Sequence, residues 1–415
     1  TDTYEPQIHG VVTSINLFRG ALQKLGHQVF IFAPADPHRE GKKIIEEGVF
    51  RFLSTNSVIV PNIPFTIPVS FKIASKIPKL HLDIIHSHTP ATMGLLADYV
   101  SNTRKIPHVY TYHTFYPEYI KHYFLKGRVI TPKMVAKYDR FYCNRTEQVI
   151  APSAKLKKVL EGFGVSVPIN VIPTGLDLAE FTDVSGQGFR DQFNLPADAK
   201  ILLFVGRIAT EKNLEYLLHA FANVAKQEPS TILALVGDGP GRKQYKELAR
   251  RLNIEKQVLF TGFLDHVHTL PAFFAAKLFL FTSLTDTQGV VIYEAIVSGT
   301  PVVMLKDEGL TEAVIEGKTG YSVEGSEADF ATQILRILRD QNLYDKLRTN
   351  CLKQANALSI ENCARKLATV YQEVIGRYHE EDSRSKFWQS FHKQISIPDI
   401  FRKNGRRLKH FFRRH

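Results

Sequence analysis

The chain has 415 residues, of which 44% are hydrophobic and 23% charged, and its formal net charge is +12. This length allows two or three domains with a large buried core, and the composition is that of an ordinary soluble globular protein. The three cysteines, Cys143, Cys351 and Cys363, are scattered. Their spacing excludes a cysteine metal site and argues against a disulfide framework, which fits a reducing, cytoplasmic compartment. No stretch is convincing as a membrane span, since the longest charge-free run, 52–71, contains three prolines.

Short apolar runs that end at Gly, Ser or Pro alternate with longer helix-compatible stretches along both halves of the chain. In the first half we predict strands at Val29–Ala33, Phe50–Leu53, Ile84–His86, Val109–Tyr112, Val149–Ala151 and Val171–Ile172. In the second half we predict them at Ile201–Val205, Ile232–Val236, Val258–Thr261, Leu278–Phe281, Pro301–Met304 and Tyr321–Val323. Such alternation predicts an α/β fold built of βαβ units with parallel sheets.

The positions of prolines, glycines and polar breaks along the chain predict its domain organisation. Prolines and glycines mark a joint near 173–188, and a helix-compatible stretch at 360–378 ends in a polar break at 380–385. We therefore expect an N-terminal Rossmann-like domain at 1–172, a C-terminal one at 173–355, a helix at 356–379 that returns to the N-terminal domain, and a tail at 380–415. The chain opens at Thr1 directly in loop-like residues, so a first strand could be missing upstream.

Two cations follow the first strand of the second half. Arg207 comes just after Gly206 at the end of that strand, and Lys212 lies five residues further on, where the next helix should start. Cations beside helix N–H groups at a strand-to-helix loop suit a diphosphate. The alternative is an ordinary surface ion pair with Glu211, which would contribute about 0–1 kcal/mol.

Two carboxylates follow another predicted strand of the same half, in the segment TDTQGVVIYEAIVSG at 285–299. If a helix begins near Gly289, Asp286 lies in the loop and Glu294 about one turn inside the helix. Both would then face the carboxyl edge of a parallel sheet, where such folds bind ligands, and could hold the hydroxyls of a sugar and a ribose. The alternative is a helix-capping Asp with a surface Glu.

Other motifs are weaker. Gly237 opens a GDGPG segment that shapes a loop beside a nucleotide more readily than it announces NAD, because the third glycine comes too early. The sequence has no HExxH, paired CxxC or Asp-x-Asp, so no motif requires a divalent metal. We expect His86 and His88 to lie on opposite faces of their strand. His113, after the strand HVYTY, could be a packed polar residue or a functional one at the interdomain cleft.

In combination these motifs resemble the retaining, GT-B-fold glycosyltransferases of family 4. The resemblance rests on Arg207 with Lys212, on Asp286 with Glu294, and on the segments SGTPVV at 298–303 and PTGLD at 173–177. The opening residues TDTYEPQIHGVV resemble the loop after the first strand of that family, with His-Gly-Val where Gly-Gly-Val is more usual. The similarity covers roughly residues 1–378.

The resemblance implies a nucleotide-sugar donor in the second domain, with UDP-glucose as the expected donor. Arg207 and Lys212 would hold the diphosphate, Glu294 the ribose, and Asp286 the transferred sugar, while His113 would lie near the reacting face of the sugar. Asp286 stands where a glutamate is more usual. The remaining residues that the resemblance assigns to donor binding are Gly10, Val11, Gly206, Gly237, Thr287, Gln288, Gly289 and Val290.

The acceptor is indicated by a segment that begins YHTFYPEYIKHY at 112–123, which resembles the bacterial 1,2-diacylglycerol 3-glucosyltransferases within this family. Basic and aromatic side chains interleave from 118 to 145, a pattern that suits an anionic membrane surface, although a solvated helix with inward aromatics is the alternative. The residues expected to face the membrane or acceptor here are Tyr119, Lys121, Tyr123, Phe124, Lys126 and Arg128.

The tail carries most of the net charge. Residues 384–415 contain ten Lys/Arg against Asp399 alone, a net +9 that leaves +3 for the rest of the chain. Trp388, Arg406 and Arg407 belong to this basic, aromatic stretch, which we expect to bind an anionic membrane. A disordered basic tail and nucleic-acid binding are the alternatives, and the bulky aromatics make nucleic acid the less favoured.

The leading hypothesis is thus a glucosyltransferase that acts on diacylglycerol while bound peripherally to the inner face of the cell membrane. Other family 4 acceptors, namely a monoglycosyl-lipid, phosphatidylinositol or a cell-wall glycan, stay open. Two other classes remain: a GT-B-like sugar-nucleotide epimerase, and a noncatalytic membrane- or nucleic-acid-binding protein.

Overall fold

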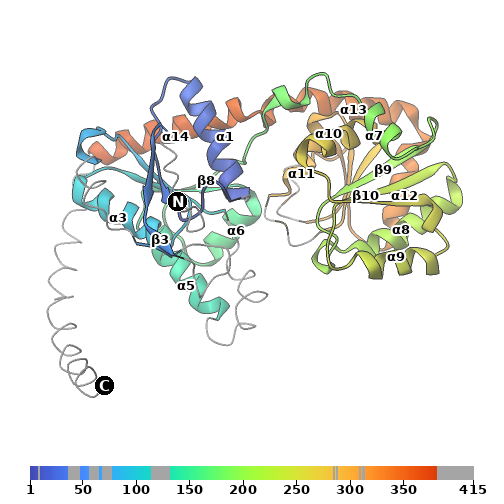
Figure 1. The fold of residues 1–415 in the computed structure, drawn as a ribbon, viewed down its shortest axis with the longest axis horizontal. Coiled ribbons are helices and arrows are strands. Elements are labelled where there is room, and N and C mark those ends of the chain that lie inside the picture. The colour runs from blue at the N-terminus through green and yellow to red at the C-terminus, as the bar shows by residue number, and fades with distance from the viewer. Residues whose placement is uncertain are drawn as a thin grey trace, which may run out of the picture.

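The computed structural model describes residues 1–7, 10–35, 47–55, 65–67, 77–113, 131–283, 286, 288–307, 310 and 314–380. Two α/β units are arranged side by side (Figure 1). We call them the N-terminal unit, which holds strands β1 to β8, and the C-terminal unit, which holds β9 to β14. The predicted α/β class with parallel sheets is confirmed, while the basic tail lies outside the described residues.

The C-terminal unit contains one six-stranded sheet in the order β11-β10-β9-β12-β13-β14, and every pair in it is parallel. The strands are β9 (Lys200–Val205), β10 (Thr231–Val236), β11 (Val258–Gly262), β12 (Leu278–Phe281), β13 (Val302–Leu305) and β14 (Gly320–Val323). Each overlaps one of the strands predicted for this half. Since β9 lies in the middle, with later strands added on both sides of it, its carboxyl end is a point where ligands bind in such sheets.

Helices cover both faces of this sheet because alternate residues of each strand point to opposite sides. Leu202 and Phe204 of β9 pack with α8 (Leu214–Gln227), α9 (Arg242–Arg251) and α12 (Glu327–Arg339). Ile201 and Leu203 pack on the other side with α7 (Gln187–Gln192), α10 (His266–Ala275) and α11 (Val290–Val297). Helix α13 (Gln341–Gln354) contributes to both clusters. A strand buried on both faces explains the continuous apolar runs in the sequence.

The N-terminal unit is divided into smaller sheets. Four parallel strands run in the order β5 (Ile85–Ser87), β6 (His108–Thr111), β7 (Gln148–Ala151) and β8 (Ile169–Val171). A separate parallel pair joins β1 (Ile31–Pro34) to β2 (Val49–Phe52), and β3 (Ser54–Thr55) pairs antiparallel with β4 (Phe65–Thr66). The last pair was not predicted, since two-residue strands leave no periodic pattern. The α-helices described in this unit are α1 (Gly10–Lys24), α3 (Thr92–Arg104), α5 (Pro132–Cys143) and α6 (Ala154–Gly162).

Helix α14 (Ile360–Glu380) follows the C-terminal unit in sequence and packs on the N-terminal one. Leu367 and Val374 share a core cluster with Phe18 and Leu22 of α1. Figure 1 shows α14 and α1 lying together along one side of the N-terminal unit. Short 3-10 helices complete the described structure at Ile77–Lys79, Leu178–Phe181, Thr210–Lys212, Glu255–Gln257 and Ala355–Leu358. Among the described helices, none has a stretch long and apolar enough to cross a membrane.

Candidate active site

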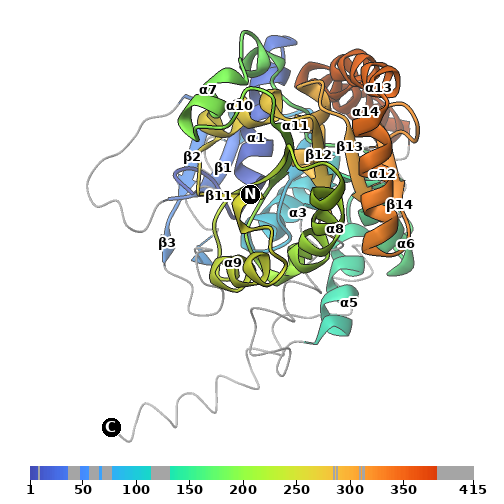
Figure 2. The same ribbon diagram turned by 90° about the vertical axis from the view of Figure 1, so that its right-hand side faces the viewer.

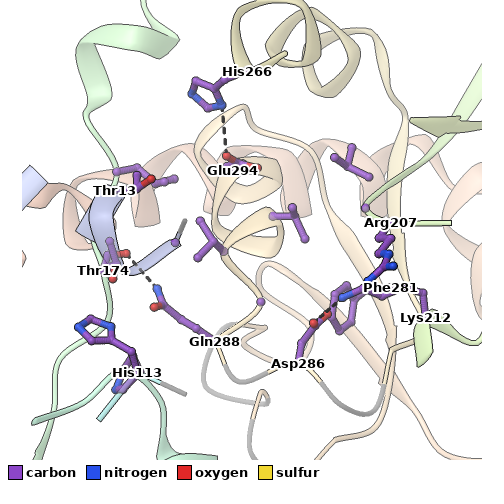
Figure 3. Close-up of a pocket in the computed structure, with 18 of the residues that line it drawn as sticks. Thr13, His113, Thr174, Arg207, Lys212, His266, Phe281, Asp286, Gln288 and Glu294 are labelled. Carbon is purple, nitrogen blue, oxygen red and sulfur yellow. Dashed lines mark hydrogen bonds and ion pairs between the residues drawn. The ribbon is translucent and has the colours of Figure 1, made fainter. Parts of the chain in front are cut away.

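A cleft of about 1130 Å³ lies between the two units. Its walls come from the first turn of α1 and the residues after β6 and β7 on one side, and from the residues after β9 and β12 on the other. The carboxyl ends of parallel strands from both units therefore meet at one space, the usual position of a ligand in such folds. Figure 3 shows the labelled side chains around it.

The two predicted cations lie on the same wall of the cleft. Gly206 and Arg207 follow β9 directly, and Lys212 ends the 3-10 turn Thr210–Lys212, two residues before α8 begins. The Nζ atom of Lys212 lies 2.5 Å from Oδ1 of Asp286. Figure 3 shows Arg207, Lys212 and Asp286 gathered at one end of the cleft. An anion bound here would meet cations whose positions the fold already fixes.

Asp286 belongs to the segment between β12 and α11, as predicted. Its side chain is about a quarter exposed, and its described partner is Lys212 rather than another acid. Gly289 caps α11 with φ +63°, in the left-handed region that favours glycine. The Gln288 Nε2 group donates to the Thr174 carbonyl at 3.1 Å, so Gln288 ties this loop to the segment that joins the units. Val290 lines the cleft, and Thr287 lies outside the described residues.

Glu294 lies at the other end of the cleft, inside the first turns of α11, and is buried. Burial raises the pKa of Glu294, while His266 nearby works in the opposite direction. His266, the first residue of α10, has Nδ1 3.7 Å from a Glu294 carboxylate oxygen and Nε2 2.8 Å from Glu180. Figure 3 shows Glu294 and His266 apart from the group around Lys212. Asp286 and Glu294, which belong to one segment of the chain, thus lie at different ends of the cleft.

The N-terminal wall is formed by the start of α1 and by His113. Gly10 and Val11 belong to the first turn of a helix rather than to a loop. A Cβ added at Gly10 would meet no atom within 4 Å. Backbone N–H groups at a helix start favour anions. His113 follows β6, lines the cleft and has Nε2 2.8 Å from Nδ1 of His88.

The structure places His86, His88 and Gly237 differently from what the sequence predicted. The expectation that His86 and His88 lie on opposite faces of their strand is wrong: their rings stack with centroids 4.3 Å apart. Residues two apart in a strand point to the same face. Gly237 does not line the cleft among the described residues but lies behind Gly206, because a Cβ at Gly237 would fall 2.0 Å from the Gly206 carbonyl oxygen.

Some predicted site residues lie outside the described ranges. They are Tyr119, Lys121, Tyr123, Phe124, Lys126, Arg128, Trp388, Arg406 and Arg407. Within the described ranges, no group of three or more His, Cys, Asp or Glu side chains is arranged to hold a metal ion.

Sequence reasoning missed His266 and Glu180. His266 follows β11, a strand of the same sheet, so its place near the carboxyl edge carried the same signal that identified Arg207 and Asp286. Glu180 lies within the predicted joint at 173–188, where a carboxylate has no distinctive spacing. Their approach to Glu294 depends on tertiary folding.

Comparison with known proteins gives consistent matches. Residues 8–180 match the model described as Glycosyltransferase Family 4, and residues 187–354 match Glycosyl transferases group 1. An alpha-monoglucosyldiacylglycerol synthase of Streptococcus pneumoniae is 35% identical over 81% of this chain and 77% of its own length. A protein of the same name from Acholeplasma laidlawii is 26% identical over 92% of this chain and 98% of its own.

The fold also matches solved structures. HepE of Anabaena in complex with UDP aligns with a TM-score of 0.69 and 20% identity, over 89% of this chain and 98% of that one. The same protein in complex with UDP-glucose aligns with a TM-score of 0.64 and 21% identity over the same shares.

Proposed function

Since the chain belongs to the family 4 glycosyltransferases, we propose that it transfers glucose from UDP-glucose to the 3-hydroxyl of 1,2-diacylglycerol, with retention of anomeric configuration. The two relatives named alpha-monoglucosyldiacylglycerol synthase support this choice of sugar and acceptor. The observation that carries the proposal is the cleft itself, where two cations and two acids of the C-terminal unit face the start of α1 and His113.

The proposal assigns each end of the donor to one end of the cleft. The ribose hydroxyls donate to Glu294, whose buried carboxylate lies apart from the cations (Figure 3). The diphosphate lies between the N–H groups at the start of α1 and the side chains of Arg207 and Lys212. The glucose then lies beside Asp286 and His113. Figure 3 shows Glu294 apart from the group of Arg207, Lys212 and Asp286, with His113 on the facing side of the cleft.

The charges suit the bond that must break. Cleavage of the anomeric carbon–oxygen bond leaves the electron pair on the β-phosphate oxygen and develops positive charge on the sugar. Fixed cations at the diphosphate therefore stabilise the transition state more than the bound donor. The acceptor hydroxyl attacks the anomeric carbon from the face that the phosphate leaves, and its proton passes to the departing diphosphate. Asp286, paired with Lys212, orients sugar hydroxyls beside this charge.

Helix α5 supports a membrane-bound acceptor. Its inner face buries Val135, Asp139 and Tyr142, while Met134, Tyr138 and Phe141 are 55%, 39% and 49% exposed. Exposed basic side chains accompany these apolar ones, and they are Lys133, Lys137 and Arg140. A helix with an apolar stripe flanked by cations suits the surface of an anionic bilayer. Figure 2 shows α5 at the periphery of the N-terminal unit.

The proposal is tested by acceptor-dependent release of UDP from UDP-glucose. The full chain is assayed with anionic vesicles that contain or lack diacylglycerol, and with a water-soluble sugar acceptor. We expect UDP release to require diacylglycerol. Equal turnover with the water-soluble acceptor in the absence of vesicles would overturn the lipid assignment, and turnover with another nucleotide sugar alone would overturn the donor.

A further inference from the structure

Three histidine rings form a continuous stack that leads from the cleft into the N-terminal unit. The His113 and His88 rings lie 5.2 Å apart at 22°, and the His88 and His86 rings 4.3 Å apart at 27°. His88 Nδ1 and His113 Nε2 share a hydrogen bond of 2.8 Å. The stack ends at α14, where the Tyr371 hydroxyl lies 2.5 Å from Nδ1 of His86.

The register of two neighbouring strands creates this stack. His86 and His88 are two residues apart at β5, so both project to the same face. His113 follows β6, which pairs in parallel with β5. Thr111 on that strand lies 2.6 Å from Nε2 of His86 through its hydroxyl, so both nitrogens of this ring have partners. Tyr371 also meets the His86 ring edge-on, at 84°. The innermost ring is thus held from three sides.

Burial keeps the two inner rings of the stack, His86 and His88, neutral. Burial lowers the pKa of His86 to about 3 and the pKa of His88 well below its usual range, and His113 adds to both effects. A neutral imidazole has one donor nitrogen and one acceptor nitrogen. Because Nδ1 of His88 and Nε2 of His113 face each other, one of the two must carry the hydrogen and the other must accept it. This hydrogen bond therefore fixes the orientation of the His113 ring relative to His88.

We propose that His88 is a positioning residue for His113, and that His86 and Tyr371 hold His88 in place from α14. The inference rests on the proposed role of His113 beside the transferred sugar. Of the described residues that line the cleft, His113 is the stack's only member, whereas His88, His86 and Tyr371 border a second cavity of about 680 Å³. We therefore expect the inner residues to affect transfer through His113.

A double-mutant cycle in the full chain tests this coupling. His88→Phe keeps an aromatic ring in the stack but removes the hydrogen bond, so we expect kcat to fall roughly tenfold, the loss of one hydrogen bond, with unchanged affinity for UDP. In the His113→Ala background the same substitution should change kcat by less than about twofold. Equal loss in both backgrounds would overturn the positioning role while the role of His113 stands. An unchanged kcat in His113→Ala alone would overturn the role of His113 and, with it, the inference.

Two further variants separate positioning from packing. His88→Asn retains a hydrogen-bonding group near the place of Nδ1 and should recover part of the lost kcat. Tyr371→Phe removes only the hydroxyl that holds His86 and should lower kcat about twofold to threefold. Its matched control is Tyr142→Phe, which removes a buried hydroxyl that donates to Ser87 at 3.0 Å outside the stack. Equal effects of the two tyrosine variants, or no recovery by His88→Asn, would contradict the inference even if His88→Phe fails to fold.

Discussion

The two walls of the cleft use different physical means to hold a ligand. The C-terminal wall stands on a single six-stranded sheet and presents charged side chains, with Lys212 paired to Asp286 and Glu294 buried beside His266. The N-terminal wall stands on smaller sheets and presents a helix start and His113, the outermost ring of the histidine stack. The ion pair of the cleft is thus concentrated on the C-terminal wall, whereas the N-terminal wall depends on the orientation of a helix start and of His113.

The largest effect should come from the charged wall. Lys212→Ala removes a fixed cation from the leaving diphosphate and should lower kcat about 100- to 1000-fold, measured as glucose transfer at saturating donor. Lys200→Ala is the matched control. Lys200 begins β9, the strand that leads to the turn of Lys212, and it also pairs with a carboxylate, Glu228, at 3.1 Å. A decrease of less than tenfold in the kcat of Lys212→Ala would contradict the view that the C-terminal wall acts mainly through charge.

The nucleoside end of the same wall should give a smaller, pH-dependent effect. Glu294→Gln removes a charged acceptor and should weaken UDP binding about 10- to 100-fold, measured by calorimetry. Because burial raises the pKa of Glu294, the native carboxylate gains its proton at a pH above the usual range of glutamate as the pH falls. UDP affinity of the native chain should therefore decline on acidification earlier than an ordinary glutamate would require. The Gln variant should lose that decline.

The free energy of unfolding should depend on pH in the opposite direction to UDP affinity. The folded chain binds the Glu294 proton more tightly than the unfolded chain, so ionisation in the fold costs stability as the pH rises through the raised pKa. Denaturant unfolding at neutral pH should thus find Glu294→Gln at least as stable as the native chain. The exposed Glu247→Gln on α9 is the control for both measurements. Marked destabilisation by Glu294→Gln alone would indicate a structural carboxylate instead of a binding one.

Removing positive charge from α5 should weaken membrane binding without changing donor binding. Lys133→Ala with Lys137→Ala on α5 should weaken binding to anionic vesicles by about 2 kcal/mol, or roughly 30-fold, with donor affinity unchanged. The control pair is Lys346→Ala with Lys353→Ala, two exposed lysines on α13 of the other unit. Flotation of the protein with vesicles measures the effect. Equal weakening by both pairs would assign it to net charge rather than to the α5 face.

The smallest effect on glucose transfer is expected at a contact between the two units away from the cleft. Lys155 at the start of α6 pairs with the buried Asp307 after β13, which links the two units. Lys155→Met should change kcat less than about fivefold because neither residue lines the cleft. It should lower the free energy of unfolding by about 1–3 kcal/mol, because the buried Asp307 carboxylate loses a charged partner. Lys157→Met, on the same helix but paired with Glu161 within one unit, is the control. A loss of transfer as large as that of Lys212→Ala would show that this contact, and not the charged wall, governs activity.

The fold was largely predictable because strands buried on both faces leave short apolar runs closed by Gly, Ser or Pro. Arg207, Lys212, Asp286 and Glu294 could be chosen as site residues because the ends of parallel strands meet at one edge. Their partners could not be read in the same way: the contacts of Lys212 with Asp286 and of His266 with Glu180 join residues 74 and 86 positions apart. The shared face of His86 and His88 was accessible from strand periodicity alone, and only its continuation through Tyr371 required the structure.

The most direct test of the central claim is the structure of the product formed from UDP-glucose and diacylglycerol in anionic vesicles. The purified lipid product is analysed by proton NMR for the anomeric configuration and the site of attachment of its sugar. We expect a single glucose in α linkage on the 3-hydroxyl of 1,2-diacylglycerol. A β-linked sugar, a sugar other than glucose, or label found only in a water-soluble product would contradict it.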